Sequence, residues 1–316
     1  MLPCRAGRGP AVPHHCAVVA KQALRMKQED WMRICWFNDN RLGLVEGDNV
    51  RDASKALKEL PKPVYPFPSQ GDPLIANLER LRPAILAAAR DAHSFPVAEV
   101  KFLSPVASPT KIIGTPTNYR DHIAEADRQR EVFGRRYSGS IEEQGLFLKA
   151  TSALVGPGEG VRLRFLERRT DHEMELGVVI GRRASNIRKE EALGYVAGYS
   201  IALDMVIRGT QDRSFRKSID SYAVLDPWLA TADEVSDPQN LDFFLAVNGE
   251  VKQKSNTSLM IMDLVTQISW ASSYYTLWPG DIIMSGTCSG VSQVKPGDVL
   301  HCEIDKVASC DVRILK

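Results

Sequence analysis

The stretch that decides the fold reads Thr170-Asp171-His172-Glu173-Met174-Glu175-Leu176-Gly177-Val178-Val179-Ile180-Gly181. Successive side chains of a β-strand point to opposite faces, so Asp171, Glu173 and Glu175 share one face. The opposite face carries His172, Met174, Leu176 and Val178. This second face, which Ile180 extends, predicts a strand that is anchored in a hydrophobic core.

The carboxylates of this stretch stand close together. Residues i and i+2 of a strand lie roughly 6.6 Å apart, so Glu173 and Glu175 can lean together and offer oxygens to one ion. Carboxylates this close repel each other and need a counter-charge. Oxygen ligands favour a hard divalent cation, Mg²⁺, Mn²⁺ or Ca²⁺, over Zn²⁺. The alternative is the solvated polar face of an edge strand, and the motif alone leaves both interpretations open.

Length and composition are those of an ordinary globular protein. The chain has 316 residues, of which 25% are charged and 44% apolar, enough for one large or two modest domains. A formal net charge of +1 gives no overall basic surface for nucleic acid. We also expect no membrane span, because no run of about 18 apolar residues occurs. The six cysteines are scattered, which is typical of reduced thiols, and we expect a cytoplasmic location.

Three regions are expected along the chain. Residues 1–31 form a basic extension that we expect to be disordered, because the first 27 residues hold five Lys or Arg and no acidic residue. Residues 32–104 form a small N-terminal domain, which opens with a hairpin around Asn38-Asp39-Asn40. It continues from residue 74 with a helix pair or one kinked helix, interrupted at Pro83. Residues 105–316 form the larger domain.

A second candidate motif in the larger domain consists of His122 and Glu125. At a spacing of three residues the two side chains can touch on a helical turn, and a Glu bonded to a His fixes its tautomer and raises its basicity. Such a pair suits a general base that activates water, although an ordinary surface pair has the same spacing. Residues 127–144 follow as a polar loop with glycines, which is typical of either disorder or a functional lid.

Further polar candidates lie at and beyond the end of the next apolar run, which closes with Asp204. Asp204, Arg208 and Gln211 would share one face of a helix, where an Asp–Arg pair is commonly just a surface ion pair. Lys217 is an isolated candidate, and a lone lysine usually lies at the surface. Each of these residues therefore carries little weight by itself.

The last third of the chain is rich in strand signals. We predict a type I′ hairpin around Asn248-Gly249, a helix that begins at Thr257, and two Pro-Gly-Asp turns that each lead into an apolar strand. Between those strands, residues 285–290 form a loop whose glycines let the backbone approach a ligand closely.

Seven blocks, in this order, resemble the fumarylacetoacetate hydrolase family. They read KIIGTPTNYRDHIAEA, FLKATSALVGPGEGV, DHEMELGVVIG, YVAGYSIALDMVIRGTQ, RKSID, VNGEVKQKSNTSLM and TLWPGDIIMSGTCSGV. The likeness is dense from Lys111 to Lys316 and looser from Met32. The chain departs from the pattern of many members at Asp226, where they have Gly, and at Cys288, where they have Pro.

The resemblance implies a fold and a set of roles. The fold would be α+β and mainly β, a roll of several mixed sheets with a small N-terminal domain, usually in a homodimer. The metal would be Mg²⁺ or Mn²⁺, with Ca²⁺ as a substitute in crystals. The resemblance maps the metal ligands onto Glu173, Glu175 and Asp204, the catalytic groups onto His122, Glu125 and Lys217, and the substrate-binding groups onto Arg208, Gln211 and Thr287. Asp171 is left with a supporting or solvent-exposed role.

Together these residues predict a metal-dependent hydrolase in catabolism that cleaves a carbon–carbon bond of a β-diketo acid. An acylpyruvate, fumarylpyruvate or a 2,4-diketo-3-deoxy sugar acid would be the small-molecule substrate. Neither nucleic acid nor a membrane is expected as a partner. Two alternatives stay open: a decarboxylase, isomerase or keto–enol tautomerase acting on a related 2-oxo acid, and a non-catalytic metal- or ligand-binding protein on the same fold.

Overall fold

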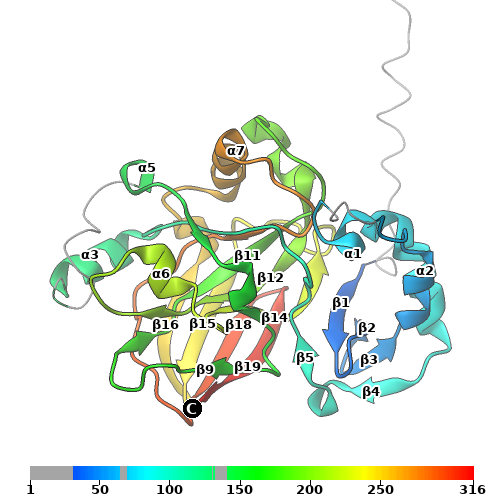
Figure 1. Cartoon of the computed structure of the whole chain (residues 1–316), viewed down its shortest axis with the longest axis horizontal. Coiled ribbons are helices and arrows are strands. Elements are labelled where there is room, and N and C mark those ends of the chain that lie inside the picture. The colour runs from blue at the N-terminus through cyan, green and yellow to red at the C-terminus, as the bar shows by residue number, and fades with distance from the viewer. Residues whose placement is uncertain (1–30, 65–69, 130, 132–140) are drawn as a thin grey trace, which may run out of the picture. The chain divides into compact units, whose positions relative to one another are not determined.

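The computed structural model describes residues 31–64, 70–129, 131 and 141–316 (Figure 1). The chain divides into two units, Met1–Trp31 and Met32–Lys316. Apart from Trp31, the predicted N-terminal extension lies outside the described residues. The description below concerns the second unit.

A mixed sheet of twelve strands runs through this unit, in the order β4-β3-β2-β1-β14-β12-β11-β17-β6-β7, with β5 paired to β1 and β8 to β14. Its strands are β1 (Arg33–Phe37), β2 (Arg41–Glu46), β3 (Asn49–Asp52), β4 (Ser94–Pro96), β5 (Phe102–Leu103), β6 (Ile112–Gly114), β7 (Phe147–Lys149), β8 (Leu154–Val155), β11 (Met174–Ile180), β12 (Val196–Asp204), β14 (Ala223–Thr231) and β17 (Ile282–Met284). Two pairs of neighbouring strands are parallel, β8 with β14 and β6 with β17, and the other pairs are antiparallel.

A second sheet has five strands in the order β16-β15-β18-β19-β9. Its strands are β9 (Val161–Arg162), β15 (Asp242–Val247), β16 (Glu250–Asn256), β18 (Val299–Ile304) and β19 (Ala308–Leu315). At the turn between β15 and β16, Asn248 and Gly249 both have positive φ, 51° and 85°, as a type I′ turn requires. The predicted hairpin is therefore confirmed, as are the strands that follow the two Pro-Gly-Asp turns, β17 and β18.

Helices cover parts of these sheets, and Figure 1 shows α2 alongside β1, β2 and β3. The helices are α1 (Pro73–Ala76), α2 (Leu78–Arg90), α3 (Arg120–Arg128), α5 (Ile141–Gln144), α6 (Arg213–Lys217) and α7 (Leu264–Tyr274), with 3₁₀ turns η3 (Ser54–Glu59), η4 (Val97–Glu99), η6 (Thr151–Ala153), η7 (Lys189–Tyr195) and η8 (Thr257–Leu259). The predicted α+β class with mixed sheets is confirmed. Among the described helices, none is long and apolar enough to cross a membrane.

Strand β11 is buried on both faces, so the edge-strand interpretation of the opening stretch is wrong. It lies between β12 and β17. Val178 packs into one hydrophobic cluster with Leu245 of the second sheet, whereas Val179 packs into another cluster with Leu81 of α2. Each face of the strand therefore lies against a core, as its near-continuous apolar run requires.

The opening stretch is also interrupted, because β10 (Thr170–Asp171) and β11 are separate strands. β10 leaves the large sheet and pairs with β13 (Val206–Ile207), whereas β11 pairs with β12. Residues 172–173 form the step between them. The predicted single strand over residues 170–181 therefore needs this correction, and the step puts Glu173 just outside β11.

Two predicted helices differ from the structure. The helix expected from Thr257 begins at Leu264, because the Asp263 side chain caps it by accepting a hydrogen bond from Thr266 N, at 2.9 Å. The helix expected through Asp204, Arg208 and Gln211 is wrong, since Asp204 closes β12 and α6 starts only at Arg213. The helices expected from residue 74 are present as α1 and α2, but the helix breaks at Asn77, and the expected interruption, Pro83, lies inside α2.

The other predicted regions are described in part. Of the expected loop at 127–144, the first two residues end α3 and the last four form α5, while residues 130 and 132–140 lie outside the described part. Strand β1 pairs with β14, so the strands that open the predicted small domain extend the large sheet. The expected boundary near residue 104 stays a prediction. Four cysteines in the described part are free thiols: Cys35, Cys288, Cys302 and Cys310.

Candidate active site

Three buried carboxylates meet where β11 begins and β12 ends. Glu175 is the second residue of β11, Asp204 is the last of β12, and Asp204 N donates to the Glu173 carbonyl oxygen at 2.9 Å. Each side chain offers an oxygen within 4.8 Å of the other two. The period-two spacing of Glu173 and Glu175 and the antiparallel pairing of β11 with β12 thus bring residues 173, 175 and 204 together.

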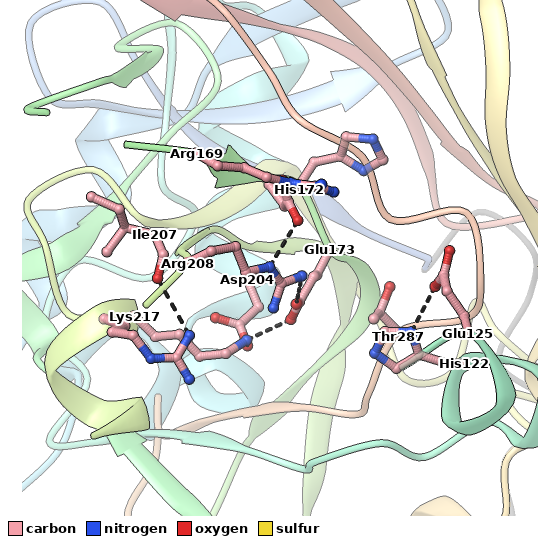
Figure 2. Close-up of polar contacts among 12 residues, drawn as sticks. His122, Glu125, Arg169, His172, Glu173, Asp204, Ile207, Arg208, Lys217 and Thr287 are labelled. Atoms are coloured by element: carbon pink, nitrogen blue, oxygen red, sulfur yellow. Dashed lines mark hydrogen bonds and ion pairs between the residues drawn. The ribbon is translucent and has the colours of Figure 1, made fainter. Parts of the chain in front are cut away.

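Positive side chains surround this acidic cluster. Figure 2 shows Glu173 between Arg208 and Lys217. Lys217 Nζ donates to Glu173 Oε2 at 2.5 Å and also to Asp204, and Arg208 Nη2 donates to Glu173 Oε1 at 3.0 Å. Lys149 Nζ is fully buried and donates to Asp204 and to the Tyr222 carbonyl oxygen. Charge-assisted hydrogen bonds of this kind offset the cost of burying the acids.

The pKa values of the two glutamates move in opposite directions. Burial raises the pKa of Glu173, but the charges of Lys217 and Arg208 outweigh burial and lower it to about 2. For Glu175, burial and then the nearby Asp204 charge raise the pKa well above its usual range, against the smaller lowering by Lys217. Glu173 is therefore already matched by cations, whereas Glu175 lacks an equal counter-charge.

The loop after β17 binds two carboxyl groups through its backbone, that of Glu175 in the cluster and that of Glu125 on α3. Gly286 N donates to Glu175 Oε2 at 2.6 Å, and Gly290 N donates to Glu125 Oε1 at 3.0 Å. Gly286 has a φ of 99°, and a Cβ there would lie 2.4 Å from Cβ of Asn118, so this close approach requires glycine. Thr287 Oγ1 donates to the Met174 carbonyl oxygen at 2.8 Å, which fixes the loop against β11.

The predicted His–Glu pair exists and is buried. His122 and Glu125 lie on α3, where the helical turn brings His122 Nδ1 within 3.0 Å of Glu125 Oε2. Their side chains are 6% and 10% exposed, so the interpretation as an ordinary surface pair is wrong. Figure 2 shows Thr287 next to this pair. A carboxylate on Nδ1 leaves Nε2 as the ring nitrogen that can exchange a proton with a ligand.

One pocket collects most of the predicted residues. Among the described residues that line it are His122, Glu173, Glu175, Asp204, Arg208, Lys217 and Thr287. Glu125 stands behind His122 rather than in the lining. Gln211 is exposed and accepts a hydrogen bond from Arg168 Nη2 at 3.0 Å, so its contact with substrate stays a prediction.

Other supporting residues were not singled out from the sequence. Lys149 is the last residue of β7, after Phe147 and Leu148. Its place directly after two apolar residues is the one sequence signal that this lysine is buried. Gln253 of β16 accepts from Met174 N at 3.0 Å and donates to Thr287 Oγ1 at 2.7 Å. It therefore links strand β11 to the loop after β17. A fully buried glutamine on a hairpin strand has no local signature, since its partners are distant in sequence.

Asp171 takes the supporting role that was one of its two predicted roles. Its carboxylate is fully buried and accepts from Arg169 Nε and from Arg208 Nε, each at 2.7 Å. Arg208 thereby holds Asp171 and Glu173 at once and is fixed at the rim of the acidic cluster. A solvent-exposed role for Asp171 is excluded.

The donor set fits a divalent cation. Glu173, Glu175 and Asp204 offer only oxygen, the ligand type that Mg²⁺ and Mn²⁺ prefer. Glu175, whose pKa burial raises, would gain from such an ion the counter-charge that its neighbours give it only in part. The three carboxylates can therefore hold the predicted metal.

The chain is similar to known proteins over most of its length. The sequence profile described as fumarylacetoacetate (FAA) hydrolase C-terminal matches residues 111–315. The maleylpyruvate hydrolase of Aquipseudomonas alcaligenes is 48% identical over 285 residues, 90% of this chain and 99% of the relative. A mitochondrial oxaloacetate tautomerase of Bos taurus is 35% identical over 281 residues, 84% of each chain.

A solved structure is similar over the same extent. The crystal structure of maleylpyruvate hydrolase from Sphingobium, in complex with manganese(II) and pyruvate, has a TM-score of 0.75 at 37% identity. The match covers 90% of this chain and 99% of that one.

Proposed function

Because the chain belongs to the fumarylacetoacetate hydrolase family, we propose that it is a metal-dependent hydrolase that cleaves a carbon–carbon bond of an acylpyruvate. The observation that carries the proposal is that His122 and the three carboxylates Glu173, Glu175 and Asp204 line one pocket. A general base and a metal site so close together suit water attack on a chelating 2,4-diketo acid. The similarity to maleylpyruvate hydrolases supports maleylpyruvate as the first substrate to test.

The acidic cluster would fix one end of the substrate. When Mg²⁺ or Mn²⁺ is bound by Glu173, Glu175 and Asp204, it supplies a Lewis acid that polarises the substrate's 2-oxo acid group. Lys217 and Arg208 lie at the same end of the pocket and attract the carboxylate. They thereby orient the diketone for attack at its acyl carbonyl.

His122 would act on water at the acyl carbonyl. Glu125 holds Nδ1, so Nε2 accepts the proton as the water oxygen bonds to the acyl carbon. The bond between that carbon and the methylene group then breaks, and its electron pair passes to the pyruvate enolate. Lys217 and Arg208 stabilise the enolate charge, and proton return from His122 completes pyruvate and a carboxylic acid.

The test is turnover of an acylpyruvate panel with the purified protein. Maleylpyruvate, fumarylpyruvate, acetylpyruvate and a 2,4-diketo-3-deoxy sugar acid are followed by loss of enol absorbance, with pyruvate measured by coupled reduction. We expect turnover that requires added Mg²⁺ or Mn²⁺ and is abolished by a chelator. Absence of pyruvate from every substrate, with metal present, would refute the proposal.

Keto–enol tautomerisation of a 2-oxo acid is the second candidate, and the similarity to oxaloacetate tautomerases favours it over other reactions. The two activities separate at His122, because hydrolysis needs water activation and tautomerisation does not. We expect His122→Ala to lower kcat for hydrolysis on the order of 10³-fold. Oxaloacetate enolisation is then measured in the same preparation: if it is fast in the wild type and unchanged in the variant while hydrolysis is undetectable in both, tautomerisation is the function.

We also propose a cytoplasmic homodimer. The resemblance to the family supports the dimer, and the free thiols of the described residues support the location. Light scattering of the purified protein at several concentrations tests the dimer. Fractionation of the source cells tests the location. A monomer at all concentrations, or recovery with another fraction, would contradict the respective proposal.

A further inference from the structure

The pocket also contains a cationic side chain, that of Arg213, which has no role in the reaction described above. Arg213 is the first residue of α6 and lies one helical turn before Lys217, so both side chains project from one side of the helix. Both stand over the ring of Phe147, with Arg213 Cζ at 5.1 Å and Lys217 Nζ at 5.2 Å from its centroid. These two distances limit the separation of the two cationic centres to about 10 Å.

The guanidinium of Arg213 is oriented by a neutral partner. Arg213 Nη2 donates to Gln144 Oε1 at 2.8 Å, and Gln144 Nε2 donates to Thr117 Oγ1 at 2.9 Å. Thr117, Phe147 and Arg213 all line the pocket. Burial lowers the pKa of Arg213, while the charges of Glu173 and Asp204 act against that lowering. A half-buried guanidinium directed by an amide and an aromatic ring is well placed to bind an anion.

The charges of the lining favour a second anionic group on the substrate. Among the described lining residues, Arg208, Arg213, Arg216 and Lys217 are cationic, and Glu173, Glu175 and Asp204 are acidic. A divalent ion on the three acids leaves an excess of positive charge, which the carboxylate of a pyruvate unit offsets only in part. A substrate with one more carboxylate would complement the pocket better.

We propose that Arg213 is a specificity-determining residue, which binds a carboxylate at the far end of the acyl group and so selects dicarboxylic acylpyruvates. The inference rests on the proposed function, because it assumes that the pyruvate end of the substrate occupies the acidic cluster. The tail then passes Phe147, and its terminal carboxylate reaches Arg213. Maleylpyruvate has such a carboxylate, whereas acetylpyruvate ends in a methyl group.

The kinetic test compares two acylpyruvates of equal chain length, maleylpyruvate and its counterpart that ends in a methyl group. For Arg213→Met we expect kcat/KM to fall on the order of 10- to 100-fold with maleylpyruvate, mainly through KM, and less than about threefold with the counterpart. Arg213→Lys, which keeps the charge but loses the planar fork, should recover part of the loss. Equal losses with both substrates would overturn the proposal.

A binding test decides the matter even if no acylpyruvate is hydrolysed. 2-Oxopimelate and 2-oxoheptanoate have the same chain length, carry no β-diketone, and differ in whether the far end is a carboxylate or a methyl group. Calorimetry with the Mn²⁺-loaded protein should show tighter binding of 2-oxopimelate, on the order of 10-fold or more, and loss of this preference in Arg213→Met. Equal binding by the wild type would overturn the inference without touching the hydrolysis proposal.

A matched variant separates recognition from a structural role. If Arg213 acts only by holding Gln144, then Gln144→Ala removes the same contact and reproduces the Arg213→Met losses with both substrates. Because Gln144→Ala removes the orienting contact but keeps the Arg213 charge, we expect this variant to keep most of the preference for the dicarboxylic member of each pair. Loss of that preference in Gln144→Ala as large as in Arg213→Met would refute the assignment.

Discussion

Where β11 begins and β12 ends, three buried carboxylates lie among lysine, arginine and backbone N–H donors. Asp226 lies on β14, the strand next to β12, and is buried beside the thiol of Cys310. The two places belong to one sheet and are similarly withdrawn from water. They differ in what surrounds the acids, and the comparison separates the effect of burial from that of counter-charge.

The difference is visible in the pKa values. Burial raises the pKa of both Glu173 and Asp226, but for Glu173 the charges of Lys217 and Arg208 reverse the effect, and its pKa is lowered to about 2. Neither carboxyl oxygen of Asp226 has a hydrogen-bond partner among the described residues, and burial raises its pKa to about 7. The neighbouring thiol of Cys310 donates to the Asp311 carbonyl oxygen instead and does not replace a cation.

Glu175 links the two cases. It belongs to the cluster by position, but burial raises its pKa, as it does that of Asp226, because Lys217 and Gly286 N offset the burial only in part. A divalent cation would supply the missing charge at Glu175, and no corresponding donor set surrounds Asp226 within the described residues. The cluster is thus suited to a metal, whereas burial of the ionised Asp226 carboxylate lowers the free energy of unfolding.

The difference between the acidic cluster and Asp226 is tested most directly by replacing one acid of each with its amide. Glu175→Gln should lower kcat for acylpyruvate hydrolysis on the order of 10³-fold, about 4 kcal/mol, because one metal ligand is lost. Asp226→Asn is the matched control, a buried carboxyl-to-amide change on the same sheet, and should keep kcat within about threefold. Steady-state kinetics at saturating Mn²⁺ measure both. Similar losses in the two variants would mean that the cluster has no special role.

The counter-charges of the cluster can be tested through stability. Lys149→Met removes a buried ammonium from Asp204 and leaves that carboxylate with less compensation. We expect the free energy of unfolding without added metal to fall by about 3 kcal/mol, and Mn²⁺ to restore part of it by supplying positive charge. Urea denaturation with and without Mn²⁺ measures both effects. A change below about 0.5 kcal/mol would show that Lys149 contributes little to compensating the buried charge of Asp204.

Much of the fold was predictable because its signals are local. The Asn248-Gly249 turn, the Pro-Gly-Asp turns and the apolar run of β11 each depend on a few neighbouring residues. The step at residues 172–173 was not predictable, since it arises when β10 pairs with the distant β13. The expected helix at Asp204 failed for a similar reason, because the spacing of polar residues fitted a helix while the backbone of β12 was fixed by its neighbours.

The candidate site was predictable in its residue types and not in its charge balance. Period-two spacing pairs Glu173 with Glu175, and the family resemblance adds Asp204 and His122. The different states of the two glutamates depend on Lys217, Arg208 and Gly286. These groups come from separate segments, so their distances follow from the tertiary structure. The same holds for Arg213, whose position over Phe147 could not be read from its spacing.

The smallest expected effect concerns Asp226, and it appears as a dependence of stability on pH. The pKa of Asp226 is raised from 3.8 to about 7 in the folded protein, so folding favours the protonated acid. This contribution is complete below the unfolded pKa and is lost as pH rises towards 7 and beyond. Between pH 5 and pH 8 the wild type should therefore lose roughly 2–3 kcal/mol of unfolding free energy relative to Asp226→Asn.

Urea denaturation of both proteins at pH 5, 6, 7 and 8 measures this difference. An asparagine amide also needs hydrogen-bond partners, so the absolute stability of the variant can lie on either side of the wild type, and the informative quantity is the change of the difference with pH. Asp305→Asn, at an exposed acid, is the control and should show a constant difference. If the Asp226→Asn difference is equally constant, Asp226 is not protonated by burial, and the contrast with the acidic cluster disappears.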